Sequence, residues 1–173
     1  MNVVRVVEVV LNNGQWYKGF EREAFRLKKA IGEQNINIHH IGSTAIPSIK
    51  TKPVIDMLIE VEDIERVNQY NQAFEKMGYS CMGEHGIEGR RFYHKGGDNR
   101  THHVHVFQKG NVEIERHIRF RDYLIAHPQE AQIYSELKQN LAEKYRFDIE
   151  SYIRGKHAFI QEIDQKANRW KKN

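Results

Sequence analysis

The sequence has few of the features that mark a secreted or membrane protein. Among its 173 residues there is one cysteine, Cys81, which has no partner for an internal disulfide. No charged-then-apolar leader opens the chain. The valine-rich start is interrupted by Arg5 and Glu8, and it is far shorter than the roughly 20 apolar residues of a membrane-spanning helix. We therefore expect a cytoplasmic protein without a membrane partner.

Proline is also scarce, with three residues, while the twelve glycines and the 29% of charged residues are typical of a folded protein. We expect a single domain over residues 1–173, with a sheet part over about 1–108 and a helical part over about 113–170. The net charge of +4 and the ten histidines are spread along the chain rather than gathered in one basic stripe. This distribution favours a small anionic ligand over a nucleic-acid partner.

The hydrophobic pattern changes from strand-like to helical near residue 108. Strands are predicted at 36–43, 52–63, 79–82, 90–95 and 101–107, with helices at 16–31 and 63–77. Three further helices are predicted at 114–126, from Pro128 to about 145, and from Asp148 or Ser151 to about 170. Together they predict an α+β fold in which helices cover one side of a mixed or largely antiparallel sheet.

The stretch from His39 to Met57 contains a phosphate-binding candidate. Gly42 and Ser43 offer backbone N–H groups and a hydroxyl at a turn, which suits a phosphate oxygen; a tight turn capped by Ser43 is the alternative. Asp56 follows on the next strand, where a proline-led bend can return it close to Ser43. A carboxylate in an apolar strand needs a metal, a cation or several donors. An ion pair with Lys52 or Arg91 is therefore the alternative to a metal.

This arrangement resembles the nucleotidyltransferase fold, whose signature corresponds here to Ile41, Gly42, Ser43 and Asp56. More narrowly, the chain resembles the GrpB family of small bacterial proteins within that superfamily. The resemblance implies Mg²⁺ held by carboxylates, with the metal aligning a nucleoside triphosphate for in-line attack. The matching pieces are HIGSTAIP, KPVID, GR followed by RFY, HHVHVF, FRDYLIAHP, Tyr134 with Lys138, and Tyr152 with Lys156.

Two positions depart from these patterns. The superfamily usually carries a second carboxylate two residues after the first, but here that position is Leu58, and Glu60 is the next acidic residue on that face. The family commonly has glycine after the proline of the turn, where this chain has Ser48. The first departure removes one ligand from a two-metal clamp.

Histidines could supply other metal ligands. His103 and His105 are two residues apart in a predicted strand and therefore project from one face. If that strand lies beside the Asp56 strand, the three side chains suit Zn²⁺, Mn²⁺ or Fe²⁺ better than Mg²⁺. Hydrogen-bonded strand histidines and contact with a phosphate are the alternatives. The expected cofactor is a divalent metal, Mg²⁺ or Mn²⁺ in preference to Zn²⁺.

Basic side chains complete the predicted site. Arg119 and Arg121 either form a solvated, self-paired helix face or clamp an anion. Lys138 and Lys156 each follow a tyrosine by four positions, so each either packs its stem on that ring or contacts a phosphate. The predicted phosphate- or substrate-binding residues are His40, Gly42, Ser43, Thr44, Lys52, Arg119, Arg121, Lys138 and Lys156.

These features lead to a nucleotidyltransferase-like protein that binds a phosphorylated ligand, first of all a nucleotide. As an enzyme it would transfer a nucleotidyl or phosphoryl group to a small acceptor, with Asp56, Arg91 and His105 as the catalytic residues. Two alternatives stay open: a non-catalytic nucleotide- or anion-binding module, and a metal-dependent hydrolase that uses the histidines and Asp56.

Overall fold

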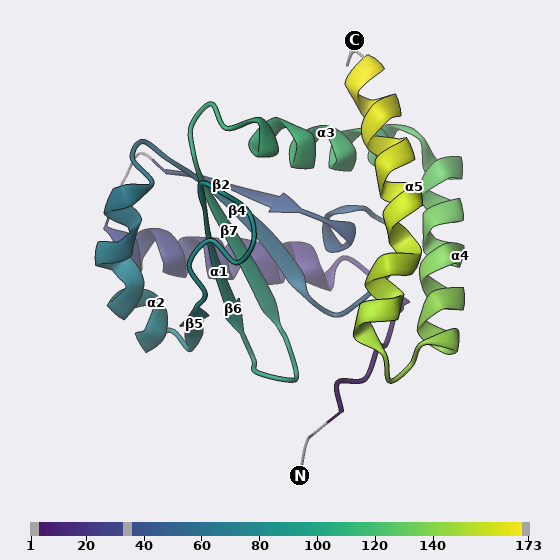
Figure 1. The fold of residues 1–173 in the computed structure, drawn as a ribbon, viewed down its shortest axis with the longest axis horizontal. Helices are drawn as coiled ribbons and strands as arrows, with labels where there is room; N and C mark the ends of the chain where they lie inside the picture. The colour runs from purple at the N-terminus through teal and green to yellow at the C-terminus, as the bar shows by residue number, and fades with distance from the viewer. Residues whose placement is uncertain (1–3, 33–35, 171–173) are drawn as a thin grey trace.

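A mixed sheet forms the centre of the computed structural model, which describes residues 4–32 and 36–170 (Figure 1). Its strand order is β2-β4-β7-β6-β5. β4 and β7 run parallel, whereas the other neighbours are antiparallel. The bounds are β2 Asn37–Ile41, β4 Ile55–Val61, β5 Tyr79–Cys81, β6 Arg90–Lys95 and β7 His102–Gln108, and β1 (Val10–Leu11) pairs with β3 (Lys50–Thr51) in a separate ladder. The buried central strand predicted at 52–63 is confirmed as β4.

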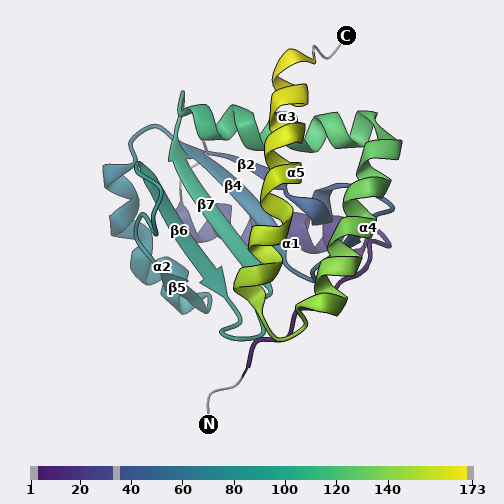
Figure 2. The ribbon, with the colours of Figure 1, turned by 45° about the vertical axis from the view of Figure 1, so that its right-hand side comes forward.

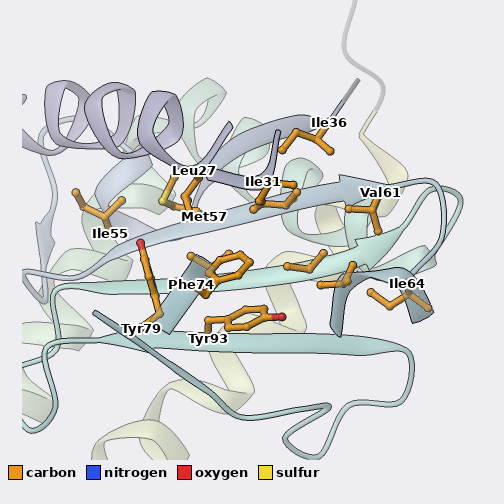
Figure 3. Close-up of a cluster of buried hydrophobic side chains, with 14 residues drawn as sticks. Leu27, Ile31, Ile36, Ile55, Met57, Val61, Ile64, Phe74, Tyr79 and Tyr93 are labelled. Atoms are coloured by element: carbon orange, nitrogen blue, oxygen red, sulfur yellow. The ribbon is translucent and has the colours of Figure 1, made fainter. Parts of the chain in front are cut away.

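One face of the sheet packs against α1 (Gln15–Ile31), the 3₁₀ helix η2 (Glu65–Tyr70) and α2 (Asn71–Lys76). Leu27 of α1 and Phe74 of α2 meet Met57 and Tyr93 of the sheet in the largest apolar cluster (Figure 3). Gly32, at φ 71°, ends α1 where the sequence predicted a stop. The expectation that helices cover only one side is wrong, because this layer lies on the face opposite the C-terminal helices.

The second face is covered by the C-terminal helices α3 (Val112–Ala126), α4 (Pro128–Lys144) and α5 (Ile149–Arg169) (Figure 2). Ile114 of α3 packs on Leu58 of β4 and Phe107 of β7. Asp148 begins α5 by accepting a hydrogen bond from the Ser151 amide at 3.0 Å, so it is Asp148 that caps this helix. The predicted helical C-terminal third is confirmed.

Alternation along the strands decides which side chains reach the second face. Met57 and Val104 point into the α1 layer, so their neighbours Asp56 and His103 point toward the C-terminal helices. Every helix in the described ranges is too short or too polar to cross a membrane. The face between the sheet and the C-terminal helices therefore carries Asp56, His103 and His105.

Candidate ligand-binding site

A glycine lets the turn after β2 lie directly against Asp56. Gly42, with φ 70° and ψ −168°, precedes the 3₁₀ turn η1 (Ser43–Ala45), and only glycine adopts such angles readily. A Cβ atom at this position would lie 2.8 Å from Oδ2 of Asp56. Since Ile41 pairs with Asp56 across β2 and β4, the turn is held beside the carboxylate by the sheet register.

Two imidazoles hold the Asp56 carboxylate. Nδ1 of His103 lies 3.2 Å and Nε2 of His105 3.6 Å from Oδ1 of Asp56. Burial raises the pKa of Asp56, but the hydrogen bonds from both histidines outweigh it and bring the pKa below its usual range. The carboxylate is therefore ionised, accepts a hydrogen bond from His103 and lies within ion-pair distance of His105. It pairs with these histidines rather than with Lys52 or Arg91, the partners considered from the sequence.

Three lysines from different parts of the chain meet in a pocket of about 260 Å³ beside Asp56. Lys52 lies between β3 and β4, Lys138 on α4 and Lys156 on α5. Nζ of Lys138 lies 4.4 Å from the ring centroid of Tyr134, and Nζ of Lys156 lies 4.7 Å from that of Tyr152. The pocket is lined by Gly42, Ser43, Thr51, Lys52, Val54, Asp56, His103, Phe120, Tyr134, Lys138, Tyr152, Ile153 and Lys156.

The positive charge in this pocket exceeds what Asp56 can balance. Lys138 is 1% exposed, and within the described part of the chain its Nζ has no hydrogen-bonding partner. Burial and the nearby charges of Lys156 and Lys52 lower the pKa of Lys138. Burial, followed by repulsion from Lys156, lowers the pKa of Lys52 to about 8. Because a buried ammonium without a partner costs several kcal/mol, an anion in the pocket would relieve the cost.

The residues present do not form a carboxylate clamp for metal ions. Leu58, at the second carboxylate position, is 0% exposed in an apolar cluster with Ile114 and Phe107. Glu60 is hydrogen-bonded to His39 instead of facing the pocket. Over residues 4–32 and 36–170, no group of three or more His, Cys, Asp or Glu side chains is arranged to hold a metal ion.

Two predicted arginines lie away from the pocket. Arg91 faces η2, where its guanidinium donates to Asn68 and Glu65, because Arg91 is on the α1 side of β6. The ion pair with Asp56 that the sequence allowed is therefore not formed. Arg119 pairs with Glu115 and Asn168 in a separate groove between α3 and α5.

The turn is braced by three predicted residues that do not line the pocket: His40, Thr44 and Arg121. Nε2 of His40 lies 2.8 Å from Oγ1 of Thr44, and its ring stacks on Phe20. Nη1 of Arg121 donates to the His40 carbonyl at 3.0 Å. Burial and the positive charge of Arg121 lower the pKa of His40 to about 4, although the negative charge of Asp56 acts to raise it. The neutral ring fits a bracing role.

Three residues of the site were not among the functional residues predicted from the sequence. Tyr134 and Tyr152 form the pocket walls, and burial raises the pKa of Tyr134 to about 12. Their i, i+4 spacing to the lysines was visible in the sequence. Arg90, which is 6% exposed, places Nη1 3.3 Å from Nδ1 of His105. The sequence did not show which of Arg90 and Arg91 faces the site, because that depends on which residues of β6 point to each face of the sheet.

The fold is that of a nucleotidyltransferase-like protein. A crystal structure of the Cid1 poly(U) polymerase with MgGTP bound aligns with a TM-score of 0.53 and 10% identity, covering 77% of this chain and 44% of that one. A likeness at this identity shows the shared fold alone.

Closer comparisons define the family. Residues 6–166 match the family described as GrpB protein, so the chain belongs to the GrpB family. The crystal structure of the conserved protein GrpB from Enterococcus faecalis is 42% identical, with a TM-score of 0.89, covering 92% of this chain and 96% of that one. The UPF0157 protein YqkA of Bacillus subtilis strain 168 is 50% identical over 168 residues, 97% of this chain. The match spans about half, 49%, of that relative.

Proposed function

We propose that this chain binds a phosphorylated ligand, first of all a nucleotide, in the pocket formed by Lys52, Lys138 and Lys156. The observation that carries the proposal is the buried Nζ of Lys138, which has no hydrogen-bonding partner among the described residues. A phosphate group offers several anionic oxygens to such ammonium groups. The adjacent Gly42–Ser43 turn adds the hydroxyl of Ser43, which also lines the pocket.

Further positive charge favours a ligand with more than one phosphate. The charges of Arg5 and Arg100 act on Lys52 and contribute to its lowered pKa. Nε of Arg100 is buried and, in the described ranges, without a hydrogen-bonding partner. A nucleoside diphosphate or triphosphate could span the lysines and this neighbouring region, whereas inorganic phosphate would reach only one of them. The lone thiol of Cys81 suits the reducing cytoplasm in which we expect such a ligand.

Calorimetric titration tests the proposal directly. Inorganic phosphate, pyrophosphate and ATP are titrated into the wild-type protein, each with Mg²⁺ and with EDTA. We expect binding that Lys138→Met reduces by at least about tenfold, since one charge-assisted hydrogen bond contributes about 1.5–3 kcal/mol. Lys144→Met is the matched control, because Lys144 is an exposed lysine of α4 that also lies over a tyrosine ring. The proposal would be overturned if the wild-type protein bound none of the three probes.

Group transfer is a second candidate, favoured by the hydrogen bond from His103 to Asp56. Because Nδ1 of His103 donates to the carboxylate, Nε2 is left to accept a proton in the pocket. An attacking hydroxyl would form a bond to the α-phosphorus of a nucleoside triphosphate, pyrophosphate would leave, and His103 would take the hydroxyl proton. Because the Cid1 crystal holds MgGTP on a similar fold, GTP is a sensible probe here.

With water as the acceptor, transfer would release pyrophosphate and GMP from GTP. His103→Gln should abolish this release while leaving GTP affinity within about twofold of wild type, the separation expected when a residue acts in the chemical step alone. GTP that binds but releases no pyrophosphate, with or without divalent metal, would favour the non-catalytic binding module. Release that requires Zn²⁺ or Mn²⁺ and is lost with EDTA would favour the metal-dependent hydrolase.

A further inference from the structure

The proton position on His105 follows from its two neighbours. Nη1 of Arg90 lies 3.3 Å from Nδ1 of His105, and Oδ1 of Asp56 lies 3.6 Å from Nε2. A guanidinium has only N–H donors, so Nδ1 must accept. The neutral imidazole then carries its proton on Nε2, and that N–H faces the carboxylate.

Arg90 is itself fixed by the loop before β6. Its Nη2 donates to the His85 carbonyl at 2.7 Å and its Nε to the Glu84 carbonyl at 3.1 Å. Its guanidinium carbon lies 4.8 Å from the ring centroid of Phe92. With two backbone carbonyls and an aromatic ring holding it, the guanidinium stays directed at His105.

This arrangement opposes metal binding. To coordinate a metal through Nε2, His105 needs a lone pair there and therefore a proton on Nδ1, where Arg90 already presents an N–H. We propose that Arg90 is a positioning residue that keeps the proton of His105 on Nε2, directed at Asp56, and so prevents a divalent metal from using Asp56, His103 and His105 together. The proposal is independent of which ligand fills the lysine pocket.

A neighbouring histidine shows the opposite arrangement and supplies an internal reference. Nδ1 of His117 donates to the Glu113 carbonyl at 2.7 Å, and its Nε2 lies 3.5 Å from Nη2 of Arg116. The His117 ring, centred 5.6 Å from that of His105, therefore carries its proton on Nδ1. The two histidines should be distinguishable by tautomer in one experiment.

Nitrogen-15 NMR of the wild-type protein tests the tautomers directly, using two-bond couplings from the ring carbon protons to both nitrogens. Near neutral pH, we expect a protonated Nε2 in His105 and a protonated Nδ1 in His117, with assignments from His105→Gln and His117→Gln spectra. A proton on Nδ1 of His105 would overturn the proposal, whatever the protein binds.

Zinc titration of variants tests the consequence. Arg90→Met frees Nδ1 of His105 to carry the proton, so Zn²⁺ affinity should rise at least about tenfold, the lower end of what partners of ligating histidines contribute. The double variant Arg90→Met/His105→Gln should lose the gain. Arg91→Met, which removes the adjacent guanidinium on the other face, should leave zinc affinity unchanged. Equal affinity in wild type and Arg90→Met, with both folded by circular dichroism, would contradict the proposal.

Discussion

The backbone of Gly42 lies so close to Asp56 that a methyl group at residue 42 would sit 2.8 Å from the Asp56 carboxylate oxygen Oδ2. Gly42→Ala should therefore lower the free energy of unfolding by about 2–3 kcal/mol, because the contact adds to backbone strain. Denaturant unfolding measures this loss. Gly14→Ala is the control, since Gly14 has φ 84° but no atom of the described residues lies within 4 Å of an added Cβ, and it should lose only about 1 kcal/mol. Equal losses would show that contact with Asp56 contributes nothing.

Lys138 should destabilise the ligand-free protein and stabilise its complex with a phosphate ligand. Its ammonium has no hydrogen-bonding partner in the described ranges, so replacing it by the apolar side chain of Lys138→Met should raise the free energy of unfolding by about 1 kcal/mol or more without ligand. Saturating pyrophosphate should stabilise the wild type more than the variant, because the wild type binds it more tightly. Thermal unfolding with and without pyrophosphate reads both effects. A variant less stable than wild type in both conditions would mean that Lys138 contributes packing alone.

The sequence predicted the strands and the turn beside Asp56 because these depend on local pattern. The β4 segment is apolar on both faces, and Gly42 marks the point where β2 ends. Arg91 was predicted to act in the site before it was known which face of the sheet it points to. Arg90 and Arg91 are adjacent in β6 and point to opposite faces, so Arg90 contacts His105 and Arg91 contacts Glu65. Only the pairing of β6 with β7 fixes these orientations.

Convergence of the lysines is the part that no local pattern could predict. Lys52 and Lys156 are separated by most of the chain, and they meet because α5 packs back over the sheet through Tyr152, which is 0% exposed. The i, i+4 pairing of Tyr152 with Lys156 indicated that the two side chains could meet, and the structure places Nζ of Lys156 4.7 Å from the Tyr152 ring centroid. It did not indicate that the amines of three lysines share one pocket with Asp56.

Lys52 should make stability rise in alkaline solution. The folded protein holds the pKa of Lys52 near 8, below its ordinary value of 10.5. Between these values the unfolded chain binds more protons than the folded one, so the free energy of unfolding increases with pH there. Below about pH 8, Lys52 is charged in both states and its burial destabilises the fold in full. Urea unfolding at about pH 7 and about pH 9 measures the change. Relative to Lys52→Met, the wild type should gain stability at the higher pH, and parallel pH profiles would exclude the shift.

Leu58 should resist replacement by a carboxylate, the residue type that the resemblance to the nucleotidyltransferase fold led us to expect at this position. Its side chain is 0% exposed and packs with Ile41, Phe107 and Ile114, so Leu58→Asp would bury a charge among apolar groups. We expect a loss of about 3–5 kcal/mol in unfolding free energy, which Mg²⁺ does not restore. Leu58→Met keeps the volume and should cost less than about 1.5 kcal/mol. A Leu58→Asp protein that Mg²⁺ returns to wild-type stability would instead show that this position can still complete a metal site with Asp56.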